Sequence, residues 1–243
     1  MCIIKVSTRK EDFMKNYNIL VCEDDKSIGN SIKIFLENKG YTVFNAENGI
    51  EALKIFEEET IHLILMDLMM PLMSGEEAIK ELRKDSYVPI IILSAKSEEE
   101  DMVNGLNIGA DDYITKPFNA NELVARVNSS IRRFYRYTED ENSEDKIKVS
   151  DAVLDLNKKV LEINGREVHL TSLEFDILRL LMSNPGRIFS MDEIYERVWN
   201  EPAIESKTVS VHVRRIREKI EIDPKNPRYL KVAWGVGYKF EAS

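Results

Sequence analysis

Short apolar runs alternate with amphipathic segments over the first half of the chain. Four of these runs have the length of a buried strand, at residues 19–22, 61–66, 90–93 and 113–115. The amphipathic segments predict helices at residues 28–39, 49–59, 75–84, 98–108 and 120–133. This alternation indicates βαβ units, so we predict an α/β fold with a doubly wound, five-stranded parallel sheet.

The pattern changes after residues 138–146, which hold five acidic side chains and no apolar one. Such a composition indicates a solvated linker, which we place at residues 134–146. Beyond it, residues 147–170 alternate in short segments with a hairpin signal at Asn164-Gly165. Helices are predicted to begin after Thr171, near Ser190 and near Ser206, before a closing hairpin that turns at residues 235–237. We therefore predict a second domain of the α+β class.

The length of 243 residues exceeds the usual single-domain size, and 43% hydrophobic residues can fill two cores. We place the domains at residues 14–133 and 147–243, whereas residues 1–13 are either a disordered extension or a start-site artefact. The sequence shows neither an uncharged apolar stretch of membrane-spanning length nor a secretory leader, so we expect a cytoplasmic protein without a membrane partner. Cys2 and Cys22 predict neither a disulfide nor a zinc site.

The net charge of −9 is unfavourable for nucleic-acid binding, but the charge is distributed unevenly along the chain. Residues 14–133 carry 13 basic and 21 acidic side chains, a balance of −8, and residues 134–146 carry 2 and 5, a balance of −3. Residues 147–243 carry 16 and 15, a balance of +1, and residues 1–13 supply the remaining +1. Residues 207–220 hold five basic side chains against Glu218 alone. Because local charge decides contact with a phosphate backbone, this segment is a candidate DNA-binding helix.

Helical spacing divides that segment into two faces. Val209, Val213, Ile216 and Ile220 are predicted to face a core. The exposed or flanking positions are then Lys207, Val211, His212, Arg214, Arg215 and Arg217. A major groove of double-stranded DNA admits one such helix, and arginine can donate two hydrogen bonds to guanine, for which Arg215 is our choice.

Polar side chains follow four strand-like runs of the first domain. Glu23 and Asp24 follow the first run, Asp67 ends the second, Ser94 ends the third and Lys116 follows the fourth. Because ligands of an open parallel sheet bind beyond the carboxyl ends of its strands, we expect these groups to converge on one pocket. Such a pocket fits phosphoryl transfer to Asp67.

Phosphoryl transfer depends on neutralising charge more than on covalent machinery. Mg²⁺ prefers oxygen ligands, which Asp24 and Asp67 could supply, with Glu23 acting through water and the backbone carbonyl of Met69 completing the shell. Lys116 would then neutralise the phosphoryl oxygens, and Ser94 would donate a hydrogen bond to one of them.

This set of residues resembles the receiver domain of bacterial two-component response regulators. Residues 109–118 are similar to a segment of the OmpR/PhoB subfamily, and the carboxyl-terminal third resembles its winged-helix DNA-binding domain. The resemblance implies that Asp67 accepts a phosphoryl group from a sensor histidine kinase, after which Ser94 and Tyr113 reorient. It also implies that the chain is not an enzyme apart from slow self-dephosphorylation.

Active receivers of this subfamily usually form homodimers through ion pairs, and Asp112 with Arg126 matches one of these pairs. Two other pairs are incomplete. Glu122 faces Met102 where the family has a basic residue, and Asp111 faces Ser129 where the family has arginine. Because exposed ion pairs contribute about 0–1 kcal/mol each, we expect a weak receiver dimer.

The resemblance assigns residues 207–217 as the recognition helix and residues 234–238 as the wing. Trp234 stands where many relatives place an arginine that enters the minor groove. Residues 200–205 match a loop that in relatives can contact RNA polymerase. The sequence does not decide between activation and repression.

Two other functions remain open. One is a magnesium phosphatase or phosphotransferase of the haloacid-dehalogenase type that uses Asp67. Such enzymes place a second aspartate two residues after the nucleophile, where this chain has Met69. The other is a regulator that binds DNA without phosphorylation, against which the complete acidic pocket argues.

Overall fold

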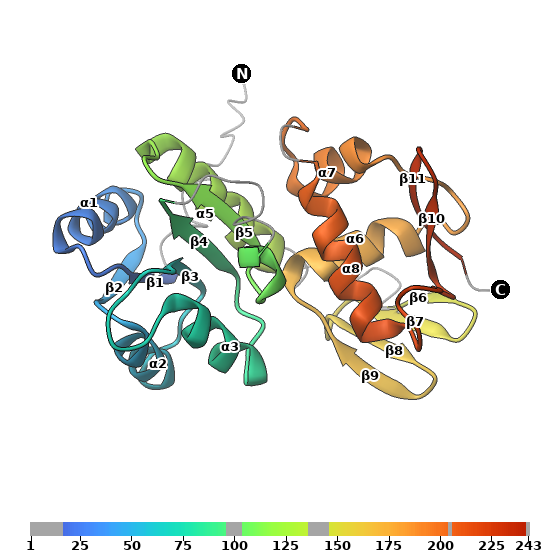
Figure 1. The fold of residues 1–243 in the computed structure, drawn as a ribbon, viewed down its shortest axis with the longest axis horizontal. Coiled ribbons are helices and arrows are strands. Elements are labelled where there is room, and N and C mark those ends of the chain that lie inside the picture. The colour runs from blue at the N-terminus through green and yellow to red at the C-terminus, as the bar shows by residue number, and fades with distance from the viewer. Residues whose placement is uncertain (1–16, 96–103, 136–145, 204–205, 242–243) are drawn as a thin grey trace, which may run out of the picture.

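The computed structural model describes residues 17–95, 104–135, 146–203 and 206–241. Two bodies, each built of helices and strands, lie side by side (Figure 1). Buried residues between Ile19 and Ile131 fill the first body in two clusters, and those between Ala152 and Phe240 fill the second. The expectation of two hydrophobic cores is confirmed.

The first body is built on a five-stranded sheet in the order β2-β1-β3-β4-β5, with every pairing parallel. The strands are β1 (Asn18–Cys22), β2 (Thr42–Ala46), β3 (Leu63–Asp67), β4 (Ile90–Ser94) and β5 (Asp112–Thr115). The strand order reverses direction between β1 and β3, which creates a crevice at their carboxyl ends. The predicted sheet is confirmed.

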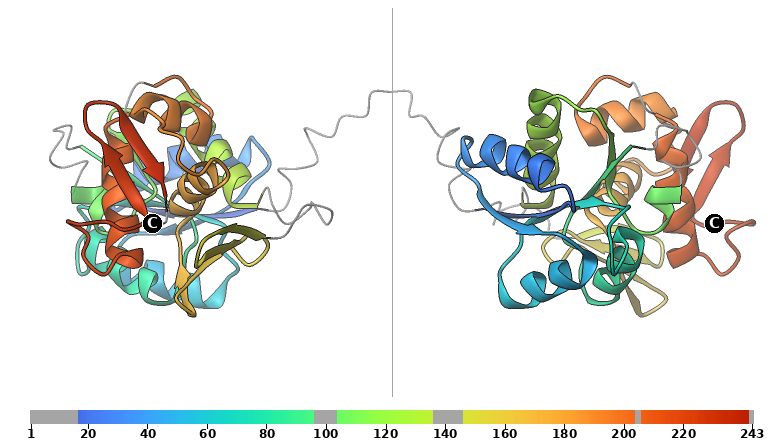
Figure 2. Two further views of the ribbon diagram at one scale, coloured as in Figure 1. Left: turned by 90° about the vertical axis from the view of Figure 1, so that its right-hand side faces the viewer. Right: turned by 60° about the vertical axis from the view of Figure 1, so that its left-hand side comes forward.

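Helices cover both faces of this sheet, as Figure 2 shows. The helices α1 (Lys26–Glu37) and α5 (Ala120–Tyr135) lie on one face, and α2 (Gly49–Glu58) and α3 (Gly75–Asp85) lie on the other. The helix α1 begins two residues earlier than predicted because Asp25 accepts hydrogen bonds from its first backbone N–H groups. The helix α5 continues to Tyr135, so the first two residues of the predicted linker are helical.

Only the end of the helix predicted at residues 98–108 falls within the described part of the chain, where residues 104–107 are helical. None of the described helices is long and apolar enough to cross a membrane. Cys22 is a buried free thiol.

The second body begins with four antiparallel strands in sequence order, β6 (Lys146–Val149), β7 (Ala152–Asp155), β8 (Val160–Ile163) and β9 (Arg166–His169). The β8–β9 turn places Asn164 and Gly165 at φ values of 51° and 73°, as the sequence predicts for a tight hairpin. Helices α6 (Ser172–Met182), α7 (Met191–Trp199) and α8 (Thr208–Ile220) follow, with Thr171 and Ser190 at the predicted N-caps of the first two.

The chain ends in an antiparallel hairpin of β10 (Leu230–Ala233) and β11 (Gly237–Phe240). Gly237 permits a close approach there, because an added Cβ would lie 1.9 Å from the carbonyl oxygen of Phe189. The hairpin stands on the side of the second body that faces away from the first, whereas α8 runs along the boundary between them (Figure 1).

Candidate active site and nucleic-acid interface

The structure brings three acidic side chains and one lysine together at the carboxyl ends of β1, β3 and β5. The Nζ atom of Lys116 lies 2.5 Å from a carboxylate oxygen of Glu23 and is also hydrogen-bonded to Asp67. One carboxylate oxygen from each of Glu23, Asp24 and Asp67 lies within 4.8 Å of the others. The predicted convergence of these four residues is therefore confirmed.

Backbone contacts fix the position of Asp67. Its Oδ1 atom accepts a hydrogen bond from the backbone N–H of Met69 at 2.9 Å, and the N–H of Gly75 donates to the carbonyl oxygen of Leu68 at 3.1 Å. An added Cβ on Gly75 would lie 2.1 Å from the carbonyl oxygen of Asp67. Glycine is required at the start of α3 because the helix packs directly onto the end of β3.

The three consecutive acidic residues after β1 make different contacts. Asp25 caps α1, Glu23 is buried against Lys116, and Asp24 is exposed beside them. Oxygen donors of this kind fit a magnesium ion, which is usually held by one or two carboxylates together with water and phosphate.

The lysine keeps its positive charge in this environment. Burial raises the pKa of Glu23, and the hydrogen bond and charge of Lys116 oppose that rise. Burial alone would lower the pKa of Lys116, but its hydrogen bonds to Asp67 and Glu23 outweigh burial and raise the pKa. The site is therefore an acidic pocket with a fixed counter-charge.

Ser94 and Tyr113 lie on the neighbouring strands β4 and β5. Ser94 is fully buried at the end of β4, and its carbonyl oxygen accepts a hydrogen bond from the backbone N–H of Lys116 at 2.7 Å. Tyr113 is buried in β5 in the same apolar cluster as Leu106 and Ala110. The peptide bond between Lys116 and Pro117 is cis.

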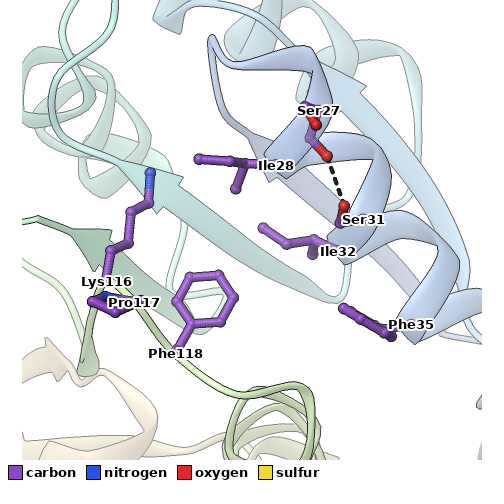
Figure 3. A pocket seen from close by; sticks show the side chains of 8 residues that line it. All are labelled: Ser27, Ile28, Ser31, Ile32, Phe35, Lys116, Pro117 and Phe118. Atoms are coloured by element: carbon purple, nitrogen blue, oxygen red, sulfur yellow. Dashed lines mark hydrogen bonds between the residues drawn. The ribbon is translucent and has the colours of Figure 1, made fainter.

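A groove of about 460 Å³ opens beside Lys116 between α1 and the segment after β5. Ile28, Ile32 and Phe35 line it from α1, and Pro117 and Phe118 line the opposite side (Figure 3). Sequence reasoning missed this groove. Phe35 is partly exposed at this groove although it is a large apolar side chain, and its exposure is visible only in the structure.

The basic helix α8 is more deeply buried than its sequence predicts. Val209, Val213, Ile216 and Ile220 pack into the core of the second body, as expected. The expectation that Val211, His212 and Arg215 are exposed or flanking is wrong, because they are 5%, 0% and 8% exposed. The first body contacts Val211 and Arg215, whereas His212 packs against Trp199 of its own domain with the charge of Arg133 nearby.

The other side chains assigned to DNA contact have different surroundings. Arg214 is exposed and paired with Glu218 at 2.9 Å, and Lys207 is exposed at the helix start. Arg217 is half-buried and donates to the carbonyl oxygen of Leu230 at 2.9 Å. Trp234 is 89% exposed at the tip of the β10–β11 hairpin. In the loop after α7, Asn200 is left-handed with φ 58°, whereas residues 204–205 lie outside the described part.

Comparison with known proteins decides the family. Residues 19–128 match the family described as "Response regulator receiver domain", and residues 165–240 match "Transcriptional regulatory protein, C terminal". The chain is 38% identical to sensory transduction protein RegX3 of Mycobacterium tuberculosis over 232 residues, which cover 92% of this chain and 99% of RegX3. The chain belongs to the OmpR/PhoB response regulators.

Two solved structures extend over the same length. DrrB of Thermotoga maritima, described as an OmpR/PhoB homolog, is 32% identical with a TM-score of 0.48, covering 93% of this chain and 99% of DrrB. A mutant of RitR is 25% identical with a TM-score of 0.74, covering 94% of this chain and all of RitR. The likeness to RitR therefore extends over both bodies of the chain.

Response regulators of this family are transcriptional regulators of two-component systems, with a receiver that generally binds Mg²⁺ and a DNA-binding domain. The first body is the receiver, and the second is the winged-helix DNA-binding domain. A sensor kinase and DNA are therefore its partners. The haloacid-dehalogenase alternative is excluded because residues 19–128, which include Asp67, match the receiver family.

The ion pairs of the expected dimer face lie within the receiver. Arg126 binds Asp112 at 3.1 Å and also lies 3.8 Å from Glu122. Within the receiver Asp111 pairs with Arg83 of α3 at 2.9 Å. The expected position of Asp111 opposite Ser129 across a dimer stays a prediction. Arg83 lies 28 residues earlier in the chain, so neither spacing nor the family pattern indicated this partner. Met102 lies outside the described residues.

Proposed function

We propose that Asp67 accepts a phosphoryl group from the sensor kinase and that this modification controls DNA binding by the carboxyl-terminal domain. The observation that supports this most strongly is the Lys116 ammonium group, which bridges Asp67 and Glu23 while Asp24 lies in reach. Both the acceptor and its counter-charge are thus in place at one strand edge.

In the proposed reaction a carboxylate oxygen of Asp67 attacks the phosphorus of a phosphohistidine. The phosphorus–nitrogen bond breaks with its electron pair passing to the imidazole, and an acyl phosphate forms on Asp67. Lys116 is positioned to bond to the phosphoryl oxygens, and Ser94 is the proposed hydroxyl donor to another. Slow hydrolysis of this acyl phosphate would be the only reaction that the chain itself promotes.

Magnesium, held by Glu23, Asp24, Asp67 and the proposed carbonyl of Met69, would supply further neutralisation of phosphoryl charge. The residues present fit this ion because all their donors are oxygen. Asp24→Ala should abolish magnesium binding, measured by calorimetric titration of the unphosphorylated chain. The same variant should lose phosphoryl uptake.

The groove beside Lys116 supports a docking role for the kinase. A protein donor must bring its histidine to Asp67, and this apolar groove lies next to the lysine that contacts the acceptor. An apolar helix of the kinase would bury Phe35 and Phe118 as it approaches.

For DNA we propose α8 as the reading helix, with Arg215 on a base edge, Lys207, His212, Arg214 and Arg217 near phosphates, and Trp234 at the wing. Val211 would pack against the groove wall. Homodimerisation through the face that holds Asp112, Glu122 and Arg126, and RNA polymerase contact through residues 200–205, belong to the same proposal. The domain limits proposed from the sequence are residues 14–133 and 147–243.

The phosphoryl assignment is tested by incubating the chain with a small phosphodonor and magnesium and measuring its intact mass. One added phosphoryl group is expected on the wild type and on Asp85→Asn, which alters an exposed acid far from the pocket. Asp67→Asn should gain none. Equal uptake by Asp67→Asn would overturn the assignment.

A further inference from the structure

The helix proposed to read DNA is held by the receiver of its own chain. Arg215 donates hydrogen bonds to the carbonyl oxygens of Leu106 at 3.1 Å and Ala110 at 2.9 Å. Its guanidinium group also lies 3.2 Å from Glu174 of its own domain. These three interactions occupy several of the donors that would otherwise be available to a base or a phosphate.

Apolar contact accompanies these hydrogen bonds. Val211, on α8, belongs to the apolar cluster of the receiver that contains Leu106, Ala110 and Tyr113. A side chain of the proposed DNA-binding helix is thereby buried in the same apolar cluster as Tyr113, the proposed switch residue of the other domain. A rearrangement of Tyr113 would change the packing around Val211 on α8, because packed cores transmit changes of shape.

A second contact lies on α5. Ser129 donates a hydrogen bond to the carbonyl oxygen of Trp199 at 3.1 Å, and the Arg133 guanidinium group lies 5.9 Å from the centre of the Trp199 ring. The ring of His212 packs against Trp199 at 5.7 Å. Neither nitrogen of His212 has a hydrogen-bond partner among the described residues, so this contact leaves a polar group buried at a cost.

A third contact lies away from α5, in the loop before β4. The ring of Tyr87 stacks on His169 of the DNA-binding domain at 5.4 Å, and Lys219 of α8 lies 5.5 Å from the same ring. Three separate regions of the receiver thus hold the other domain in one orientation.

We propose that this arrangement is a closed state in which the receiver competes with DNA for α8. The inference rests on the proposed function, since it assumes that α8 binds DNA. It also predicts competition with dimerisation, because Ser129 belongs to the face where receivers of this family pair. Dimer formation and release of α8 would then favour each other.

The expected change in affinity for DNA follows from the fraction of molecules in the open state. A closed population of about nine in ten lowers the apparent affinity for DNA about tenfold. Weakening the contact should recover most of that factor without adding any contact to DNA.

Two variants of the full chain test this, each with a matched control. Ser129→Arg places a large charged side chain inside the α5 contact, and Ala125→Arg makes the same change at an exposed position one turn earlier. Tyr87→Ala removes the third contact, which lies outside the dimer face, and Tyr87→Phe keeps the ring.

The first measurement is carbethoxylation of histidine by diethylpyrocarbonate, located by mass spectrometry. His169 is exposed and serves as an internal reference for the buried His212 in the wild type and the α5 variants. For Tyr87→Ala the reactivity of His212 is compared directly with its reactivity in the wild type, because the ring of His169 stacks on Tyr87. We expect His212 to react far more slowly than His169 in the wild type and in both controls, and to gain reactivity in Ser129→Arg and Tyr87→Ala.

The second measurement is affinity for a random-sequence duplex at low ionic strength, where basic helices bind without a known target. The two opening variants should bind about tenfold more tightly than their controls. The proposal is overturned if His212 of the wild type reacts as fast as His169, or if neither variant differs from its control in labelling. It is also overturned if both variants expose His212 without any gain in affinity for DNA. A chain that binds no duplex in any variant contradicts the proposed function, whereas the labelling still reports on the closed state.

Discussion

Asp111 is expected to stabilise the receiver fold and to have no direct part in its dimer. Its carboxylate accepts hydrogen bonds from Arg83 at 2.9 Å and from the backbone N–H of Ile90 at 3.0 Å, and it is 1% exposed. Removing one member of a buried ion pair costs about 3–5 kcal/mol, because the other charge is left buried. Arg83 also donates to three backbone carbonyl groups, which keep it partly satisfied. We therefore expect Asp111→Ala to cost about 3 kcal/mol, at the lower end of that range.

The free energy of unfolding is measured by urea denaturation of residues 14–135, with an unchanged m-value as evidence that only stability has changed. Glu81→Gln is the control on α3, because its pair with Lys84 is exposed and should contribute less than about 1 kcal/mol. A double-mutant cycle with Arg83→Met should give a coupling energy of about 1–3 kcal/mol. An Asp111→Ala receiver that unfolds at the wild-type urea midpoint but loses self-association would show that Asp111 serves the dimer instead.

Four further outcomes are expected. Gly75→Ala should destabilise the receiver by about 1–3 kcal/mol in urea denaturation and slow phosphoryl uptake, because the added Cβ would meet the carbonyl oxygen of Asp67. Unchanged stability would contradict this close approach. Phe35→Glu should slow transfer from the sensor kinase and leave uptake from a small phosphodonor unchanged, whereas Ile34→Glu, outside the groove, should slow neither. Burial lowers the pKa of His212 to about 3, aided by Arg215 and Arg133 and opposed by Glu174, so the closed state binds fewer protons than the open one. The contribution of His212 to closure should therefore be fully present above the ordinary histidine pKa of about 6.5 and be lost as the pH falls towards 3, seen as faster hydrogen exchange in α8. His212→Gln should remove this dependence. Trp234→Ala should weaken DNA binding without changing the slope of affinity against salt, since no charge is lost; a changed slope would mean that the wing acts through a neighbouring basic residue.

The acidic pocket could be predicted because it needs only strand order and strand ends. Each functional side chain follows its strand by no more than two residues, and parallel strands share their carboxyl edge. Periodicity likewise gave the core face of α8. The start of α1 was missed by two residues because Asp25 acts as its N-cap.

Contacts between distant segments could not be predicted. The partner of Asp111 lies 28 residues away, and Arg215 lies more than a hundred residues from Leu106 and Ala110. A basic, partly apolar helix face carries the same pattern whether it meets a DNA groove or another domain, because both remove it from water. The burial of Val211 and His212 therefore could not be predicted without knowing how the receiver packs against α8.

The chemistry of Arg215 explains why such a closed state could be reversible. In the receiver its guanidinium group meets neutral carbonyl oxygens, whereas DNA offers charged phosphates and guanine acceptors. Glu174 lies in the same domain as Arg215 and accepts from Lys219 at 2.6 Å, so its charge accompanies α8 in either state. The exchange then replaces two hydrogen bonds to neutral carbonyl acceptors by bonds to anionic phosphate or to guanine, and it relieves the unpaired nitrogens of His212. The apolar contact of Val211 opposes this exchange, because full burial of such a side chain stabilises the closed state by about 1.5–3 kcal/mol. Because these opposing contributions are of similar size, a shift of about 1.4 kcal/mol at Tyr113 is enough to change the open fraction roughly tenfold.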